Sequence, residues 1–157
     1  MQTTGSCYGH SHSLSNELVL LTLIMCIQTT KLSLTIQLCN QIHSSVVETL
    51  VTNCSNLEVV TMAGLKDVTD TVALSIAHHC PAIQRISFRN CDISDVGVCE
   101  IAVFCSQLSM LAVAGVHCLT DKCILALAEN CPYIEELYLS GCAKITKQAV
   151  TYLKVNS

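Results

Sequence analysis

Cysteine and histidine are the residue types in this chain that could do chemistry, and cysteine is the more abundant. The 157 residues include 12 cysteines and six histidines, which could form disulfides, bind zinc or supply a thiolate nucleophile. The spacing decides among these, because Cys54, Cys80, Cys105 and Cys131 recur at intervals of 26, 25 and 26 residues. Secreted disulfide scaffolds are loop-rich with irregular cysteine gaps, so the regular intervals indicate a structural repeat.

Two short motifs combine histidine with cysteine, His78-His79-Cys80 and His117-Cys118. Structural zinc sites usually show paired ligands such as Cys-x-x-Cys, which the sequence lacks, and we expect His78 and His79 to end a helix instead. A catalytic thiolate needs a lowered pKa beside an orienting base, and periodic cysteines do not indicate one. No Gly-rich phosphate loop or HExxH motif occurs either. We therefore expect no metal, no cofactor and no enzymatic activity.

Composition predicts one soluble domain with an aliphatic interior. Hydrophobic residues make up 51% of the chain, yet Trp is absent and only four Tyr and two Phe occur. The formal net charge of −4 offers no positive field for nucleic acid or anionic lipid. The apolar stretch 18–27 is about half as long as a bilayer span, and no Lys or Arg precedes it. We expect no membrane span and a cytoplasmic or nuclear location.

Between the cysteines, an apolar triplet recurs in each unit. The last two members of each triplet alternate with outward residues, which is typical of a short strand. A turn with Gly, Asn or Ser follows, and then a Ser, Thr or Asp that can cap a helix before a segment of helical spacing. The triplets are Leu57, Val60, Met62; Ile83, Ile86, Phe88; Leu108, Leu111, Val113; and Ile134, Leu137, Leu139.

Each unit is therefore predicted to be strand, turn and helix, and a period of 25 to 26 residues lies in the leucine-rich range. One such unit cannot bury its own apolar faces, so neighbours must stack into a continuous core. The sequence predicts an α/β leucine-rich repeat solenoid, a short horseshoe of about five repeats with strands on the concave side. The repeat domain covers 28–157, and its first, degenerate unit precedes Cys54.

Cysteine also recurs at the tight turn that follows each strand, in Cys39, Cys91 and Cys142. Buried cysteine behaves as a small hydrophobe with a weak S–H donor, so it can sit under the turn and meet a backbone carbonyl. Leu65 and Val116 occupy the same position in their units. This position therefore needs a small or medium apolar group and not a metal ligand.

These units resemble the cysteine-containing subfamily of leucine-rich repeats, whose pattern runs roughly Cys-Pro-x-Leu-x-x-Leu-x-Leu-x-x-Cys-x-x-Ile-Thr-Asp. The closest match in this chain is Cys131-Pro132-Tyr133-Ile134, Leu137-Tyr138-Leu139, Cys142 and Ile145-Thr146, and residues 80–95 follow it nearly as well. The resemblance covers about four-fifths of the chain. In the family, such repeats mostly belong to F-box substrate receptors of SCF ubiquitin ligases and to antagonist-of-mitotic-exit-network proteins, which lack an F-box.

The N-terminal segment 1–27 is set apart from the repeats. Residues 14–25 look like the opening helix of an F-box, with Glu17-Leu18 in the familiar place, but no Trp or basic helix follows. The segment is thus an F-box remnant, or residues 14–27 form a capping helix or a divergent first repeat that covers the open end of the core.

If the strands line a concave face, both arginines of the chain lie there, Arg85 and Arg89 in one strand. Arg and Tyr often anchor protein interfaces, and a guanidinium holds carboxylate or phosphate at two points. The arginines therefore bind an acidic or phosphorylated partner segment, or they only solvate an apolar strand. We predict that the partner-binding residues are Arg85, Ser87, Arg89, Met110, Ala112, Glu136, Tyr138 and Ser140, and that Val59, Thr61, Ala63 and Ala114 are also exposed.

Alanine at 63, 112 and 114 either shapes a shallow groove for a partner side chain or permits tight curvature, and both interpretations stay open.

The resemblance implies a protein-interaction module that recognises substrates or acts as an adaptor in SCF-type ubiquitin-dependent degradation. The alternatives are a scaffold or inhibitor unrelated to ubiquitin, and a fragment or splice form of a longer receptor.

Overall fold

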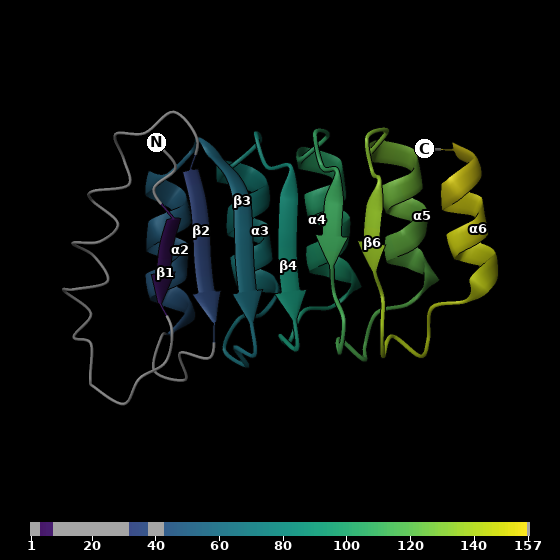
Figure 1. Ribbon diagram of the computed structural model, residues 1–157, viewed down its shortest axis with the longest axis horizontal. Coiled ribbons are helices and arrows are strands. Elements are labelled where there is room, and N and C mark those ends of the chain that lie inside the picture. Colours follow the sequence, from purple (N-terminus) through teal and green to yellow (C-terminus); the bar gives the residue numbers. More distant parts are fainter. Residues whose placement is uncertain (1–3, 8–31, 38–42, 157) are drawn as a thin grey trace.

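A computed structural model describes residues 4–7, 32–37 and 43–156. It confirms the predicted α/β solenoid, because the strands form one sheet and the helices cover one side of it (Figure 1). The predicted N-terminal helix at 14–25 and Cys39 lie outside the described residues. The elements are β1 (Thr4–Cys7), β2 (Leu32–Gln37), α2 (Ser44–Asn53), β3 (Leu57–Ala63), α3 (Asp70–His79), β4 (Arg85–Arg89), α4 (Asp95–Phe104), β5 (Met110–Ala112), α5 (Asp121–Asn130), β6 (Glu136–Tyr138) and α6 (Lys147–Asn156).

The six strands are parallel and lie side by side in chain order from β1 to β6. Successive strands are parallel because the helix after each of β2 to β5 returns the chain to the start of the next strand. Equivalent residues of the repeats therefore align across the sheet, as in the row Val60, Ile86, Leu111 and Leu137. Strand β1 belongs to the segment 1–27 that we set apart, and it pairs with β2, so the sheet extends into that segment.

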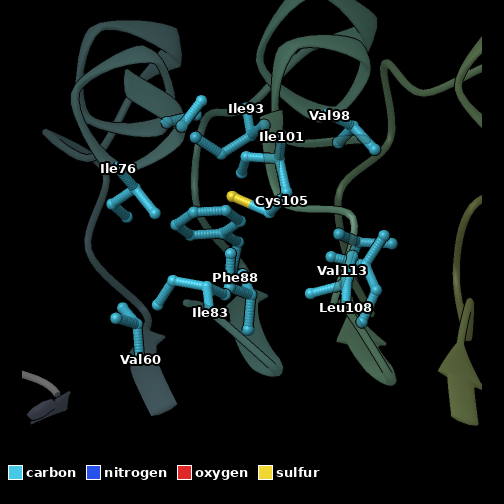
Figure 2. Close-up of a cluster of buried hydrophobic side chains, with 14 of the residues drawn as sticks. Val60, Ile76, Ile83, Phe88, Ile93, Val98, Ile101, Cys105, Leu108 and Val113 are labelled. Atoms are coloured by element: carbon cyan, nitrogen blue, oxygen red, sulfur yellow. The ribbon is translucent and has the colours of Figure 1, made fainter. Parts of the chain in front are cut away.

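The core lies between the sheet and the helices and consists of aliphatic layers shared by neighbouring repeats. Figure 2 shows Phe88 of β4 beside Ile76 of α3, Ile101 of α4 and Cys105, and all four side chains are completely buried. Burying one such large apolar side chain contributes about 1.5–3 kcal/mol relative to leaving it exposed. Because the layer around Phe88 draws on two helices, no single repeat can form it alone.

The helices begin as the sequence predicts. Ser94 and Thr120 are the N-caps of α4 and α5, and their hydroxyl oxygens accept hydrogen bonds from the backbone N–H groups of Val96 and Lys122. Thr69 precedes α3 without such a side-chain bond. Each capping hydroxyl satisfies a backbone donor that has no partner within the helix.

The aspartate at the start of α3, α4 and α5 has a second role that the sequence did not suggest. Asp95 of α4 accepts hydrogen bonds from the backbone nitrogen and hydroxyl of Thr120, at 2.9 and 2.5 Å. Asp70 binds Ser94 in the same way, and Asp121 binds Thr146. We call these contacts the aspartate ladder. Each step joins the first turn of one helix to the N-cap that precedes the next helix.

Glycine at position 97 allows α3 and α4 to approach each other closely. A Cβ atom there would lie 2.6 Å from Oδ1 of Asp70 and 2.8 Å from Cβ of Ala73, distances too short for real contacts. The Gly97 N–H instead donates to Asp70 Oδ1 at 3.2 Å. The aspartate ladder and the close packing of these two helices therefore depend on the same position.

We expect Asp95→Ala to lower the free energy of unfolding by about 1–3 kcal/mol, because it leaves two donors of Thr120 without their acceptor. The matched control is Asp92→Ala in the same turn, where the side chain is exposed and a change within about 0.5 kcal/mol is expected. Urea unfolding followed by far-UV circular dichroism measures both variants. Equal stability of the two variants would show that the ladder contributes nothing.

Candidate protein-interaction surface

We call the side of the sheet that points away from the helices the sheet face, and it corresponds to the predicted concave surface. Of the predicted partner-binding residues, Arg89, Tyr138 and Ser140 are exposed on it, and Arg85, Met110 and Glu136 are partly exposed. These side chains come from β4, β5 and β6 and from the turn directly after β6. The accessible predicted residues thus gather over the three C-terminal strands.

Two predicted contact residues are buried, so their assignment to an exposed surface was wrong. Ser87 is 5% exposed and Ala112 is 1% exposed. They lie next to each other in the row Thr61, Ser87, Ala112 and Tyr138. The side chain of Ala112 is small, and the longer Arg89 of β4 meets the Tyr138 ring of β6 across β5.

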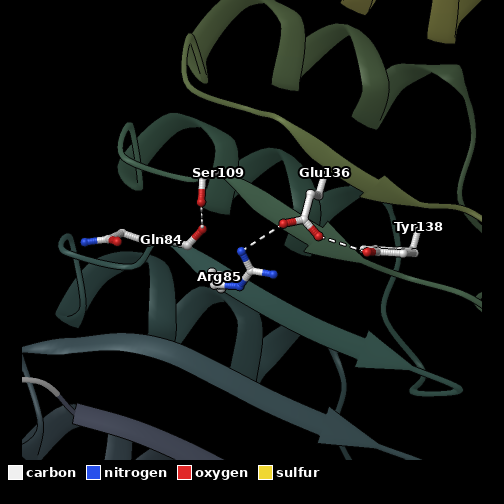
Figure 3. A network of polar contacts seen from close by, with 5 residues as sticks. All are labelled: Gln84, Arg85, Ser109, Glu136 and Tyr138. Atoms are coloured by element: carbon white, nitrogen blue, oxygen red, sulfur yellow. Dashed lines mark hydrogen bonds and ion pairs between the residues drawn. The ribbon is translucent and has the colours of Figure 1, made fainter.

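An ion pair joins β4 to β6 across the intervening strand. Nη1 of Arg85 donates to Oε1 of Glu136 at 3.0 Å, and the Tyr138 hydroxyl donates to Oε2 of the same carboxylate at 2.8 Å (Figure 3). In register, Met110 lies between Arg85 and Glu136. The pair is only partly shielded, since the two side chains are 41% and 38% exposed, and water will weaken their attraction.

Arg89 completes this group from the other end of β4. Its guanidinium carbon lies 5.3 Å from the centre of the Tyr138 ring, within range of a cation–π contact. No carboxylate in the described part of the chain lies within ion-pair distance of Arg89. We call Arg85, Arg89, Glu136 and Tyr138 the arginine–tyrosine cluster. Two guanidinium groups and one carboxylate give the cluster an excess of one positive charge.

Hydrogen bonding within the cluster shifts two pKa values. The bond from Arg85, together with the bond from Tyr138, lowers the pKa of Glu136, because both donors favour the ionised carboxylate. The carboxylate in turn raises the pKa of Tyr138, since ionising the hydroxyl would remove the donated hydrogen bond and place two negative charges together. At neutral pH the cluster therefore contains an ionised Glu136 and a neutral Tyr138.

The sequence indicated each member of the cluster separately and missed that they bind one another. The available signal was the alignment of the repeats, which places Arg85 and Glu136 at equivalent positions of strands two apart. The remaining predicted positions, Val59, Thr61, Ala63 and Ala114, are partly exposed. These side chains are small or β-branched, so the arginine–tyrosine cluster is the main polar group on the sheet face over β3 to β6.

The periodic cysteines lie inside the solenoid, where their thiols donate to backbone carbonyls of the preceding repeat. Sγ of Cys80 donates to the carbonyl of Cys54 at 3.3 Å, and Sγ of Cys105 donates to the carbonyl of Cys80 at 3.7 Å. At the turn positions, Cys91 and Cys142 donate to carbonyls one repeat earlier, at 3.7 and 3.2 Å. The predicted role of the turn cysteines is confirmed for these two residues.

Burial makes these thiols poor nucleophiles. Desolvation raises the pKa of Cys80 and Cys131 to about 12 and that of Cys105 to about 11. The thiolate is the reactive and metal-binding form, and it is scarce at neutral pH in groups with such pKa values. Their regular spacing thus reflects packing in each repeat.

The histidine motifs have structural contacts. His78 and His79 end α3, as predicted; Nε2 of His78 lies 3.4 Å from Glu100, and Nδ1 of His79 lies 2.9 Å from the Ser75 carbonyl oxygen. Within residues 4–7, 32–37 and 43–156, no group of three or more His, Cys, Asp or Glu side chains is placed to hold a metal ion. None of the helices in these ranges is long and apolar enough to cross a membrane.

The stacked strand–turn–helix units define the fold class, a leucine-rich-repeat-like solenoid. No family model matches the sequence. Among curated proteins, antagonist of mitotic exit network protein 1 of Eremothecium gossypii is 26% identical over 100 residues, which cover 61% of this chain and 25% of that protein. The chain therefore spans about a quarter of the length of this relative.

Solved structures share the fold at low sequence identity. The actin-binding site 2 of leiomodin-1 matches with a TM-score of 0.66 and 14% identity, over 93% of this chain and 90% of that chain. The tropomodulin C-terminal domain of Caenorhabditis elegans matches with a TM-score of 0.64 and 8% identity, over 85% of this chain and 90% of that chain. The yeast Rad7–Elc1 complex contains a chain that matches with a TM-score of 0.55 and 16% identity, over 90% of this chain and 44% of that one.

We expect Arg85→Gln to raise the pKa of Glu136 towards the ordinary value of a glutamate, because it removes the largest cause of the lowered value. Tyr138→Phe removes the second hydrogen bond and should give a smaller rise. The carboxyl carbon of Glu136 can be followed by NMR during a pH titration. Lys122→Gln, which removes a charge on α5, is the control and should leave this pKa unchanged; an unshifted pKa in Arg85→Gln would contradict the ion pair.

Proposed function

We propose that this chain is a non-catalytic protein-interaction module that binds a partner protein through the sheet face. The observation that carries the proposal is the arginine–tyrosine cluster, which combines two residue types that often dominate interface energies on one accessible surface. The contacts among Arg85, Glu136 and Tyr138 already order these side chains in the free protein. Ordering before binding reduces the entropy lost when a partner docks.

The partner segment that best fits the cluster is acidic or phosphorylated. Arg89 has a guanidinium that no described carboxylate neutralises, and Arg85 uses one nitrogen for Glu136. A carboxylate or phosphate beside Arg89 would form charge-assisted hydrogen bonds and would meet the excess positive charge of the cluster. The net charge of the whole chain is −4, so this positive surface is local and favours docking of an anionic segment there.

The setting we propose is substrate selection or adaptor function in SCF-type ubiquitin-dependent degradation. Two findings support it: the resemblance of the repeats to those of F-box substrate receptors, and the similarity to antagonist of mitotic exit network protein 1. The fold likeness to a chain of the Rad7–Elc1 complex is compatible with this setting. The alternative is a scaffold or inhibitor that uses the same sheet face without any link to ubiquitin.

Affinity capture of the tagged full chain from cell lysate tests the proposal. We expect a Skp1-type adaptor, a cullin and a further bound protein to be recovered together, and the Arg85→Glu/Arg89→Glu variant to lose that further protein by about tenfold or more. Lys66→Glu/Lys122→Glu carries the same charge change at exposed sites away from the sheet face and should retain it. Phosphatase treatment of the lysate shows whether phosphate or carboxylate is bound.

The outcomes separate the two settings. A bound protein without ligase components, still lost in the arginine variant, would favour the independent scaffold and keep the sheet face as the interface. A bound protein indifferent to the arginines, or lost equally in the lysine control, would contradict the proposed role of the cluster. Circular dichroism of each variant confirms that the fold is intact.

A further inference from the structure

Ser87 lies on the sheet face and is nevertheless almost completely buried. Its neighbours along β4, Ile86 and Phe88, belong to the core, so alternation along the strand turns the Ser87 side chain to the sheet face. Among the residues whose side chains the structure describes, it is the only polar one that is buried, at 5% exposed. Burying a hydroxyl is unfavourable unless it forms a hydrogen bond, so this position needs an explanation beyond packing.

The Ser87 hydroxyl has no hydrogen-bond partner in the described part of the chain. The Ser109 hydroxyl, by contrast, donates to the Gln84 carbonyl oxygen at 3.0 Å. No completely buried side-chain oxygen or nitrogen of the described residues lacks a partner, so part of the small exposed area of Ser87 belongs to its hydroxyl. Buried polar groups are usually paired, and this one remains available to a ligand that comes from outside.

Two arginines flank this hydroxyl on the same strand. Arg85, Ser87 and Arg89 alternate along β4 and therefore share the sheet face. Each arginine is two residues from Ser87, about 7 Å along the strand, a distance that the long side chain of arginine can span. The register partner of Ser87 on β5 is Ala112, whose side chain ends at Cβ and takes little of the space between the arginines. We call Arg85, Ser87 and Arg89 the β4 triplet.

Both guanidinium groups keep hydrogen-bond donors for a ligand. Arg85 donates to Glu136 through Nη1, at 3.0 Å, and a guanidinium has further N–H donors on its other nitrogens. Arg89 contacts the ring of Tyr138, with 5.3 Å between its guanidinium carbon and the ring centre. Glu136 and Tyr138 both belong to β6, so the two arginine side chains extend over β5 in the same direction. A ligand between them would lie next to Ser87.

We propose that the β4 triplet is a phosphate site and that Ser87 makes it specific, so that the partner segment carries a phosphorylated serine or threonine. This inference rests on the proposed function and decides between the two anionic groups that it allows. A phosphate ester has three terminal oxygens, one for each member of the triplet, and a charge of about −1.5 to −2 at neutral pH. A carboxylate has two oxygens and a single charge, so it would leave one member of the triplet without a partner.

The surface beside the β4 triplet suits a phosphate on a short side chain. On β3, the sheet-face positions are Val59, Thr61 and Ala63, which are small or β-branched. An extended partner segment can therefore lie close to the sheet next to β4. From there a phosphoserine or phosphothreonine reaches the triplet without the length of a tyrosine ring.

Three end-capped peptides that differ at one residue distinguish the two anionic groups. They carry phosphoserine, glutamate or serine at the centre of an otherwise identical sequence of alanine and glycine. NMR titration of the full chain, followed at the backbone amides of Ser87 and Ala112, gives the dissociation constant of each peptide. We expect the phosphoserine peptide to bind about tenfold more tightly than the glutamate peptide, and the serine peptide not to bind.

Ser87→Ala separates the β4 triplet from a general attraction of anions to the arginines. It removes one donor to the phosphate and should weaken the phosphoserine peptide about tenfold, with little change for the glutamate peptide. Thr61→Val is the matched control, because Thr61 is the register partner of Ser87 on the side of β4 away from the arginine side chains. It removes a hydroxyl at nearly constant shape and should leave both affinities unchanged.

Three results would overturn the inference. They are no binding of the phosphoserine peptide at millimolar concentration, equal binding of the phosphoserine and glutamate peptides, and an affinity that Arg85→Glu/Arg89→Glu abolishes but Ser87→Ala leaves intact. In the third case the arginines still bind anions and the proposed function stands. Failure of the proposed function gives a different result, a captured protein that is indifferent to the arginines. Circular dichroism melting curves of each variant verify that the sheet remains folded.

Discussion

Each repeat of this protein buries its apolar strand and helix faces only against its neighbours, and this constraint determines most of the structure. Phe88, buried beside α3 and α4, belongs to a layer that no single repeat completes. Polar contacts also join neighbouring repeats. The thiol of Cys105 donates to the carbonyl of Cys80, and Asp95 binds the N-cap threonine of the next helix. The residue types that first suggest chemistry are thus used to join repeats, at the spacing that stacking requires.

This use of cysteine and aspartate leaves recognition to side chains that point away from the core. On the sheet face, the parallel register aligns side chains of strands two apart, so Arg85 can reach Glu136 across β5, where Met110 lies between them in register. The result is a preordered group with excess positive charge on an otherwise weakly polar surface. The cluster combines cations with apolar neighbours, and we propose that it binds an anionic protein segment.

The sequence predicted the repeat and its elements well because periodicity reports directly on which side chains are buried. The interval of the cysteines located the units, and the turn positions of Cys91 and Cys142 have the carbonyl contacts expected of them. Ser87 and Ala112 were misplaced because alternation along one strand shows only which face a residue lies on. Whether neighbouring strands then cover it depends on side-chain length across the sheet. Asp95 was likewise understood only as part of a cap, since its partner lies 25 residues away.

We propose that the sheet face, and not the helical side, recognises the partner protein. The most direct measurement places a photo-crosslinking amino acid at one position in cells, either at Tyr138 on the sheet face or at Val103, an exposed residue of α4. Both side chains are accessible, with exposed fractions of 45% and 55%, so a bound protein could reach either position. We expect a covalent adduct with the bound protein from position 138 and none from position 103. An adduct from position 103 with none from position 138 would contradict the account.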